Sequence, residues 1–225
     1  ERNDFKPLAG LIVRLCDTHP PGYLVRTFKY LESACGVPIT RAFDLGVSEA
    51  MRRIGMEWSE GARSVAREHR FTQKVLDALY GLRGPDMELP SPTKPIAIVG
   101  CAETSYHEIG AMFVRLALEW AGWQVCYLGS NVPFGEFAVI QPELKARLVA
   151  ISFVPPCGNA DAKRCLAILS SQYRPDRPYS LALGGGGLDP EALDLVKRPF
   201  MAAKAWSSTE ALAGWAKAQI RLRPD

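Results

Sequence analysis

The sequence lacks several features that would assign it to a familiar class at once. Its six cysteines are scattered, and none forms the C-x-x-C pair that zinc sites and redox motifs use. No stretch reaches the ~20 consecutive apolar residues that a membrane span requires. The N-terminal residues 1–4 are not followed by a secretory hydrophobic region. These absences predict a cytoplasmic protein with reduced thiols and no membrane partner.

Charge and catalytic motifs are also sparse. The formal charge is +3, from 27 Lys and Arg against 24 Asp and Glu, which is too balanced to predict a surface that follows nucleic-acid phosphates. There is no Ser-His-Asp order, no pair of carboxylates in one loop and no P-loop lysine. We therefore expect that the chain is not an enzyme by itself.

One proline-rich segment divides the sequence into two regions. Residues 83–95 read RGPDMELPSPTKP, and their four prolines cannot continue a helix. We predict a helical bundle over residues 1–82, a linker over 83–95 and an α/β domain over 96–225. The chain is long enough, and at 48% hydrophobic residues apolar enough, for two modest cores.

The N-terminal region has the spacing of amphipathic helices. Apolar residues recur at intervals of three and four, which is typical of a helix with one buried face. Four helices are expected, around Leu8–Leu15, Tyr23–Leu31, Phe43–Ile54 and Glu60–Tyr80.

The C-terminal region alternates short β-rich runs with amphipathic stretches, as parallel sheets wound with helices do. The predicted strands are Ile96–Cys101, Gln124–Leu128, Leu148–Phe153, Ser180–Leu183 and, more weakly, Phe200–Ala202. The predicted helices are His107–Gly122, Phe134–Lys145, Asp161–Gln172, Pro190–Lys197 and Ser208–Leu222. The expected fold is α/β: a four-helix bundle followed by a flavodoxin-like or Rossmann-like sheet of five parallel strands.

The turn after the first strand is where such a sheet would bind a ligand. Its glycines are too far apart for the G-x-G-x-x-G pattern of dinucleotide sites. It offers a histidine, His107, followed three residues later by Gly110, which permits close backbone approach. A neutral imidazole is a good ligand for cobalt or iron, although a solvent-exposed histidine at a helix start has the same spacing.

The H-x-x-G turn at His107 and Gly110 resembles that of the cobalamin-binding family, and the similarity continues through the segment Tyr127–Pro133. The resemblance implies that His107 is the lower axial ligand of cobalt. It also implies that small residues line a tunnel for the displaced nucleotide tail. The residues that it assigns to the cofactor site in this domain are Ser105, Tyr106, His107, Glu108, Gly110, Leu128, Gly129, Ser152, Val154, Gly184 and Gly185. The sequence departs from the family at Ser105, where the family has Asp or Glu as a hydrogen-bond partner of the histidine.

A second motif lies in the helical region, where Trp58 is followed after nine residues by Glu68 and His69. We predict that Trp58, Val65 and His69 share one helix face, because they recur at helical intervals. The W-x9-EH spacing resembles the cap of the cobalamin-dependent CarH-type photoreceptors. The resemblance implies that Trp58, Val65, Glu68 and His69 contact the cofactor and that His69 is a possible upper ligand. A core tryptophan, a core histidine and an ordinary surface glutamate remain open as simpler interpretations.

The resemblance implies a function as well. CarH-type proteins carry an N-terminal helix-turn-helix, whereas we expect no DNA-binding motif in this chain. Stand-alone members of the family resemble the AerR/PpaA antirepressors, so the expected role is a light or redox sensor that regulates transcription by contacting a repressor or another regulatory protein. The form of the cobalamin, whether adenosyl, methyl or hydroxo, stays open.

Two other functions fit the same pattern of residues. One is a corrinoid carrier subunit of a methyltransferase, in which the cofactor carries the chemistry and a partner subunit binds the substrate. The other is a sensor that holds heme or a bilin, because His107 can ligate iron and a flat pocket can accept another tetrapyrrole.

Overall fold

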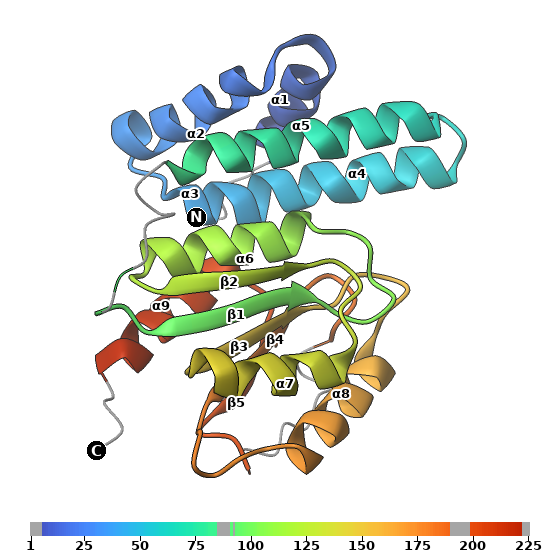
Figure 1. Cartoon of the computed structure of the whole chain (residues 1–225). Coiled ribbons are helices and arrows are strands. Elements are labelled where there is room, and N and C mark those ends of the chain that lie inside the picture. Colours follow the sequence, from blue (N-terminus) through green and yellow to red (C-terminus); the bar gives the residue numbers. More distant parts are fainter. Residues whose placement is uncertain (1–5, 85–90, 92, 190–198, 222–225) are drawn as a thin grey trace. The chain divides into compact units, whose positions relative to one another are not determined.

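The computed structural model describes residues 6–84, 91, 93–189 and 199–221. Backbone contacts divide the chain into two compact units, Glu1–Asp86 and Met87–Asp225, and each is described by itself (Figure 1). The predicted linker over 83–95 spans this division, and its residues 85–90 and 92 lie outside the described part of the chain.

The first unit consists, in its described residues, of helices joined by short turns. It contains α1 (Lys6–Thr18), α2 (Pro21–Cys35), α3 (Ile39–Ala42), a π-helical turn η1 (Phe43–Val47), α4 (Ser48–Ser59) and α5 (Val65–Arg83). Helix α2 begins at Pro21 and ends before Gly36, which has φ 65°. Proline is common in the first turn of helices and glycine just after their last turn. The segment α3–η1–α4 is one continuous helical run that contains a π turn.

Apolar side chains of α1, α2, α4 and α5 form the core of this helical unit. Ile12, Leu24, Phe28, Ile54 and Phe71 are almost completely buried. The π turn approaches α1 closely, because a Cβ on Gly46 would lie 2.7 Å from Cδ2 of Leu8. A larger residue at position 46 would therefore displace the Leu8 side chain where α1 packs against η1.

The predicted helix face that joins Trp58 to His69 is wrong. Trp58 lies in the last turn of α4, and α5 begins only at Val65. Gly61, with φ 74°, breaks the helix between them, and Ser64 caps α5 by accepting a hydrogen bond from the Arg67 amide. Trp58 and His69 therefore lie on two helices, and the W-x9-EH spacing spans a turn.

The second unit is a five-stranded parallel sheet with helices on both faces. The strands are β1 (Ile96–Cys101), β2 (Gln124–Gly129), β3 (Leu148–Ser152), β4 (Ser180–Gly184) and β5 (Ala203–Trp206), in the order β2-β1-β3-β4-β5. The helices are α6 (Ile109–Trp120), α7 (Phe134–Leu144), α8 (Asn159–Ser171) and α9 (Thr209–Arg221). This order is that of flavodoxin-like proteins, so the predicted fold class is confirmed.

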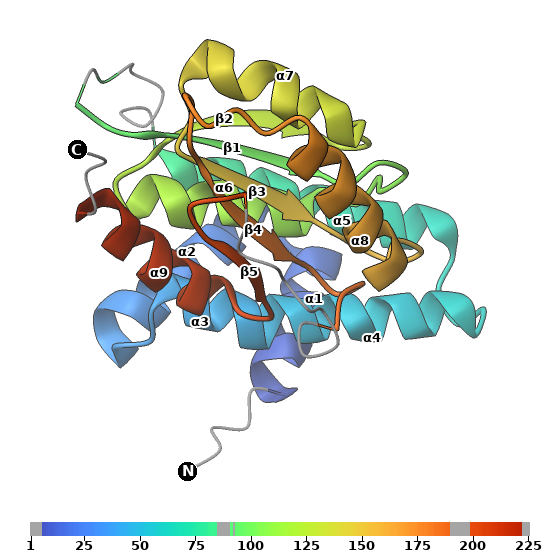
Figure 2. The ribbon, with the colours of Figure 1, turned by 90° about the horizontal axis from the view of Figure 1, so that it is seen from below.

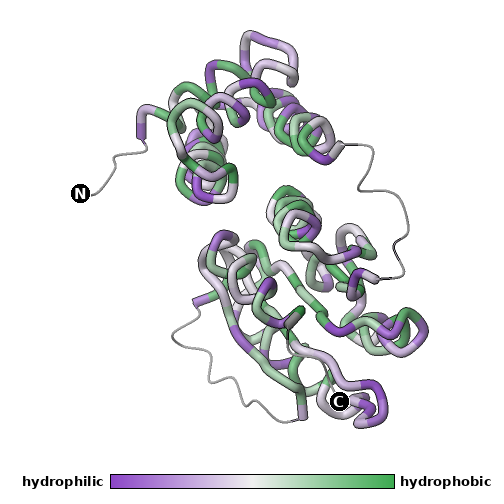
Figure 3. The backbone as a smooth tube through the Cα atoms, turned by 90° about the vertical axis from the view of Figure 1, so that its left-hand side faces the viewer, coloured by the Kyte–Doolittle hydropathy of each residue, from purple (hydrophilic) through white to green (hydrophobic). Residues whose placement is uncertain are grey.

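Two hydrophobic cores lie on opposite faces of the sheet. One face packs against α7 and α8 around Phe137, Phe153 and Leu169, and the other against α6 and α9 around Trp123 and Leu212. Figures 1 and 2 show the two pairs of helices on the two faces. The central strands β1, β3 and β4 are buried almost throughout, and hydrophobic colour dominates the interior of this unit in Figure 3.

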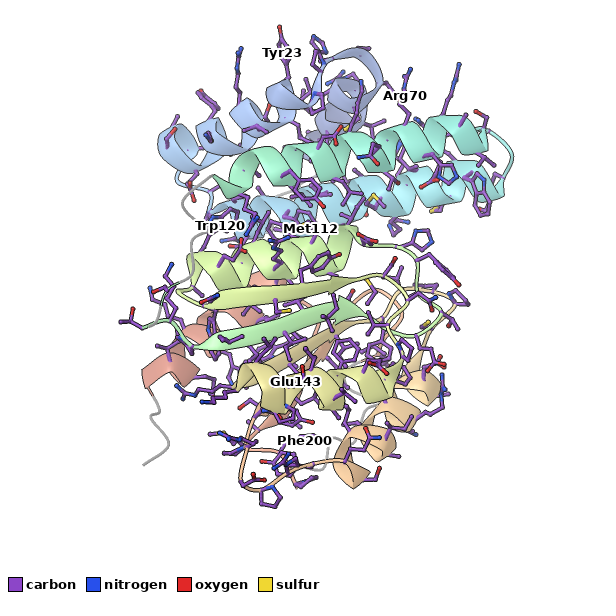
Figure 4. The ribbon with its side chains drawn as sticks, in the orientation of Figure 1. Tyr23, Arg70, Met112, Trp120, Glu143 and Phe200 are labelled. Carbon is purple, nitrogen blue, oxygen red and sulfur yellow. The ribbon has the colours of Figure 1, made fainter. Side chains whose placement is uncertain are left out.

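Several predicted boundaries differ from the structure, and one example is the helix expected from Glu60, which begins at Val65. The fifth strand is Ala203–Trp206 and not Phe200–Ala202. Phe200 lies before the strand begins (Figure 4), and its ring packs edge-on against those of Tyr173 and Tyr179. The helix predicted from His107 begins at Ile109. The predicted helix Pro190–Lys197 lies outside the described residues.

Candidate site at the carboxyl edge of the sheet

The carboxyl ends of four adjacent strands bring the predicted site residues of the α/β unit to one edge. β1, β2, β3 and β4 end at Cys101, Gly129, Ser152 and Gly184. The strand order reverses between β1 and β3, and ligands of open α/β sheets bind at such a point. The loop after β1 carries His107.

His107 lies in an irregular segment just before α6, and its side chain is exposed. The start of the loop is tied to the sheet, because the Ala102 amide donates to the Ser152 carbonyl at 2.9 Å. Thr104 then turns the backbone with φ 68°, a left-handed conformation that is uncommon for a β-branched residue. The imidazole of His107 is thus exposed to solvent on a loop whose first residues are hydrogen-bonded to the sheet.

The loop after β2 holds the His107 loop through two reciprocal hydrogen bonds. The Thr104 amide donates to Oδ1 of Asn131 at 2.8 Å, and the Asn131 amide donates to the Ser105 carbonyl at 2.8 Å. Asn131 is itself left-handed, with φ 52°. Sequence reasoning did not identify Asn131, although it lies in the Tyr127–Pro133 segment that carried the family resemblance.

A hydroxyl of β2 contacts the other end of the loop. The Tyr127 hydroxyl donates to Oε2 of Glu108 at 3.3 Å. The register of β1 and β2 shifts between Val99 and Gly100, so that Leu128 is the extra residue of a β-bulge. Tyr127 begins the segment Tyr127–Pro133 that carries the family resemblance, but its contact with Glu108 was not predicted.

Two buried thiols pack beneath the loop. Sγ of Cys157 lies 3.3 Å from the Glu103 carbonyl and 3.3 Å from the Thr104 hydroxyl. The Cys101 thiol points to the His107 carbonyl at 3.5 Å. Burial raises the pKa of Cys101 to about 12, helped by the nearby Glu108 carboxylate, so this thiol is neutral near pH 7. Both thiols therefore pack against the loop, and Cys101 is not a nucleophile.

Small residues line the edge beside the loop. A Cβ on Gly110 would lie 3.3 Å from Oγ of Ser152, so the first turn of α6 passes close to the end of β3. Gly185 has φ 112°, and a Cβ there would lie 2.2 Å from the Phe153 carbonyl oxygen. A Cβ on Gly184 would lie 2.9 Å from the Trp206 carbonyl oxygen. Only glycine fits at 185, and larger residues at 110 and 184 would displace their neighbours.

Ser105 is a buried hydroxyl with no hydrogen-bond partner. Its side chain is 1% exposed, and Oγ has no acceptor or donor within reach. Such a group costs about 1–3 kcal/mol unless something satisfies it. It stands two residues before His107, where the resembling family has a carboxylate.

The remaining predicted residues of this domain lie around the same edge. Tyr106 is 70% exposed beside His107, and Leu128, Gly129 and Val154 are half-buried at or just after the ends of β2 and β3. The structure thus gathers the predicted residues of the α/β unit at one sheet edge, and their contacts with a cofactor stay a prediction.

The predicted residues of the helical unit form no comparable cluster. Trp58 and Val65 are about half exposed, at 51% and 52%. The His69 side chain is 73% exposed, with Nδ1 2.9 Å from Oε2 of Glu68. Oε1 of Glu68 accepts a hydrogen bond from the Thr72 hydroxyl at 2.8 Å. Each polar contact joins neighbours on α5.

These residues fit a cofactor that brings most of its own metal ligands. Among the described residues, no three His, Cys, Asp or Glu side chains gather as they do in a protein metal site. A single accessible imidazole, the unsatisfied Ser105 hydroxyl and a glycine-lined edge match the needs of a metal macrocycle with an attached tail. The residues that would hold it are His107, which would supply a nitrogen ligand, and Gly110, Ser152, Gly184 and Gly185, whose small or absent side chains would leave room for the tail.

The fold and the site define a class: a helical unit followed by a flavodoxin-like unit whose sheet edge presents a histidine. No family model matches the chain. The chain is 30% identical over 154 residues to the HTH-type transcriptional repressor CarA of Myxococcus xanthus, a match that covers 67% of this chain and 50% of that protein. It is 28% identical over 128 residues to trimethylamine corrinoid protein 1 of Methanosarcina mazei, covering 53% and 56%. The chain therefore spans about half the length of the curated relatives it matches.

A solved structure supports the fold over the whole chain. The monomethylamine corrinoid protein of Methanosarcina barkeri superposes with a TM-score of 0.65 at 19% identity, covering 99% of each chain. Repressors and corrinoid proteins among the relatives together support the resemblance to cobalamin-binding domains on which the cofactor prediction rests. Within the described part of the chain, no helix is both long and apolar enough to cross a membrane.

Proposed function

We propose that the chain binds a cobalamin at the carboxyl edge of its sheet, with His107 as the protein ligand to cobalt, and that it acts as a sensor that regulates transcription. The observation that carries the proposal is the exposed His107 imidazole, held at the switch point of the sheet beside Gly110 and Ser152. Corrinoid proteins among the relatives support the choice of cofactor.

Each residue of the edge has a defined task in this proposal. The imidazole of His107 supplies a nitrogen lone pair. Gly110, Ser152 and Gly184 leave room for a nucleotide tail, because their side chains are small or absent. Ser105 supplies a buried hydroxyl close to the histidine. Bound cobalamin supplies a cobalt whose upper bond responds to light or to redox state.

The regulatory part of the proposal is supported by the similarity to CarA and CarH, which are named as HTH-type transcriptional repressors. The chain would bias a two-state contact with a repressor or another regulatory protein according to the ligand on cobalt. It would not be an enzyme by itself. In the helical unit, the residues that the resemblance assigns to the cofactor are Trp58, Val65, Glu68 and His69, and His69 would be a possible second ligand to cobalt.

Absorption spectroscopy of the reconstituted protein tests the cofactor, its ligation by His107 and its response to light. Wild-type protein mixed with adenosylcobalamin should take up one equivalent and change its spectrum on illumination, and wild-type protein mixed with hydroxocobalamin should show imidazole ligation. His107→Ala should lose that ligation. A protein that takes up heme but no cobalamin would contradict the cofactor, and a Soret band would identify a heme sensor. A holoprotein that is inert to light would contradict the light-driven version.

A corrinoid carrier for methyl transfer is the second candidate. The similarity to trimethylamine corrinoid proteins favours it, at 25–30% identity over a little more than half of this chain. It predicts that methylcobalamin bound to the chain passes its methyl group to a thiol when a methyltransferase subunit is added. The sensor predicts a response of a regulatory complex to light or redox state without such transfer.

A further inference from the structure

The loop that carries His107 is contacted at both of its ends by β2 and the segment that follows it. From this juxtaposition we infer that Asn131 and Tyr127 are positioning residues for His107: Asn131 fixes the loop before the imidazole and Tyr127 fixes it after. The inference rests on the proposed function for the ligand of His107. The position of the loop depends on hydrogen bonds within the α/β unit and not on the cofactor. The positioning inference and the proposed function can therefore fail separately.

Asn131 stabilises a turn that the sequence would not adopt by itself. Thr104 has φ 68°, and left-handed backbone is disfavoured for a β-branched residue. The Thr104 amide donates to Oδ1 of Asn131, and the Asn131 amide donates to the Ser105 carbonyl, both at 2.8 Å. Through these two bonds, the side chain and the backbone amide of Asn131 both hold the segment immediately before His107.

Tyr127 fixes the point at which the loop becomes helix. Its hydroxyl donates to Oε2 of Glu108 at 3.3 Å. Glu108 is the residue before α6, and its carbonyl already accepts the Met112 amide at 2.8 Å. Because His107 lies between Ser105 and Glu108, the two contacts bracket it.

The Tyr127 ring is itself held in place. The Arg115 guanidinium lies over the ring, with Cζ 5.5 Å from the ring centroid. Arg115 also donates to Oε1 of Glu119 at 3.2 Å, and Glu119 is only 7% exposed. A buried ion pair on α6 therefore orients the ring whose hydroxyl reaches Glu108. The β-bulge at Leu128 turns this part of β2 relative to β1.

Four variants separate the effect of the contacts from a change in general stability. Asn131→Gly removes the side-chain acceptor but tolerates φ 52°, and Asn131→Asp keeps the acceptor. Tyr127→Phe removes the hydroxyl and keeps the ring under Arg115. Tyr179→Phe is the control, because it removes a tyrosine hydroxyl just before β4 that is buried and has no hydrogen-bond partner.

Amide hydrogen exchange of the cofactor-free protein tests the positions. Peptides that cover residues 103–112 should exchange about fivefold faster in Asn131→Gly and Tyr127→Phe than in the wild type, which corresponds to the loss of one hydrogen bond. Asn131→Asp and Tyr179→Phe should leave exchange unchanged. A merely local backbone effect would make Asn131→Gly slower, because glycine relieves the left-handed strain. Unchanged or slower exchange in both test variants overturns the inference.

Cobalamin binding tests the consequence for His107. After reconstitution with hydroxocobalamin and reduction to the cobalt(II) state, nitrogen splitting in the electron paramagnetic resonance spectrum reports a nitrogen ligand to cobalt, and an isotope label on the histidine nitrogens distinguishes the protein imidazole from the benzimidazole of the cofactor. Asn131→Gly and Tyr127→Phe should weaken binding about tenfold and reduce the split fraction, as changes around a metal ligand do, while Asn131→Asp and Tyr179→Phe match the wild type. If the wild type shows no splitting, the proposed function fails while the exchange result stands. If all variants match the wild type, the inference is overturned.

Discussion

Two histidines were singled out from the sequence, and their surroundings differ in kind. His107 follows a buried strand, and its loop is joined by hydrogen bonds to loops after β2 and β3, far away in the sequence. His69 lies on the exposed side of α5, and its imidazole contacts the carboxylate of Glu68, the preceding residue. Contacts with distant segments thus determine the position of His107, whereas the position of His69 depends on its own helix.

The comparison teaches that the sheet edge is built for a fixed geometry and the helical surface is not. Changes at the edge should therefore have large and specific effects, and changes around His69 should leave the free protein almost unaffected. The predictions below test this difference in order of decreasing effect.

The largest effect on stability is expected at Gly185. Gly185→Ala should lower the free energy of unfolding by about 3 kcal/mol, because the new Cβ meets the Phe153 carbonyl and φ is 112°. Gly186→Ala is the control next to it, since a Cβ there meets nothing within 4 Å. Urea unfolding followed by circular dichroism measures both. Equal stability of the two variants would mean that the edge is looser than its backbone indicates.

The next effect concerns the space beside α6. Gly110→Val should weaken cobalamin binding about tenfold, equivalent to about 1.4 kcal/mol of overpacking against Ser152. Binding of cobinamide, which has no nucleotide tail, should change less. Gly214→Val on α9 is the control, because no atom lies within 4 Å of its Cβ position. Equal losses for both corrinoids in Gly110→Val would contradict a tail site at this edge.

A smaller effect of opposite sign is expected at Ser105. Ser105→Ala should stabilise the cofactor-free protein by about 1 kcal/mol, because it removes a buried hydroxyl without a partner. The same variant should bind cobalamin more weakly than the wild type if the hydroxyl serves the cofactor. Thermal unfolding with and without cobalamin measures both quantities. A destabilised free protein would show that Oγ has a partner within the fold.

The smallest effect is expected at His69. His69→Ala should change the free energy of unfolding by less than about 0.5 kcal/mol, because the side chain is 73% exposed and pairs only with its neighbour on the helix. Its effect should emerge only with the cofactor bound, as an altered spectrum after illumination. A photoproduct identical to that of the wild type would remove His69 as an upper ligand.

Most of the fold was predictable, because its determinants are local. Apolar runs such as Leu148–Ser152 are buried on both faces and read directly as central strands. The last strand was misplaced, since the apolar Phe200 belongs to an aromatic cluster with Tyr173 and Tyr179 that no local pattern reveals.

The site was predictable in its residues and not in its contacts. His107 was identifiable because it follows the first strand, whereas the bond from Thr104 to Asn131 joins residues 27 positions apart. The shared helix face of Trp58 and His69 failed for a local reason. Gly61 ends the helix before it and Ser64 caps the next one, and both residue types indicate a helix boundary that the apolar periodicity does not reveal.

The left-handed turn at Thr104 has a consequence for protein engineering. A threonine in this conformation is held by neighbours on two other loops, Asn131 and Cys157. Grafting the stretch from Ala102 to Gly110 onto another scaffold would therefore not transfer its shape. A transplant that retains the geometry must bring the asparagine and the cysteine along, or replace the threonine with glycine.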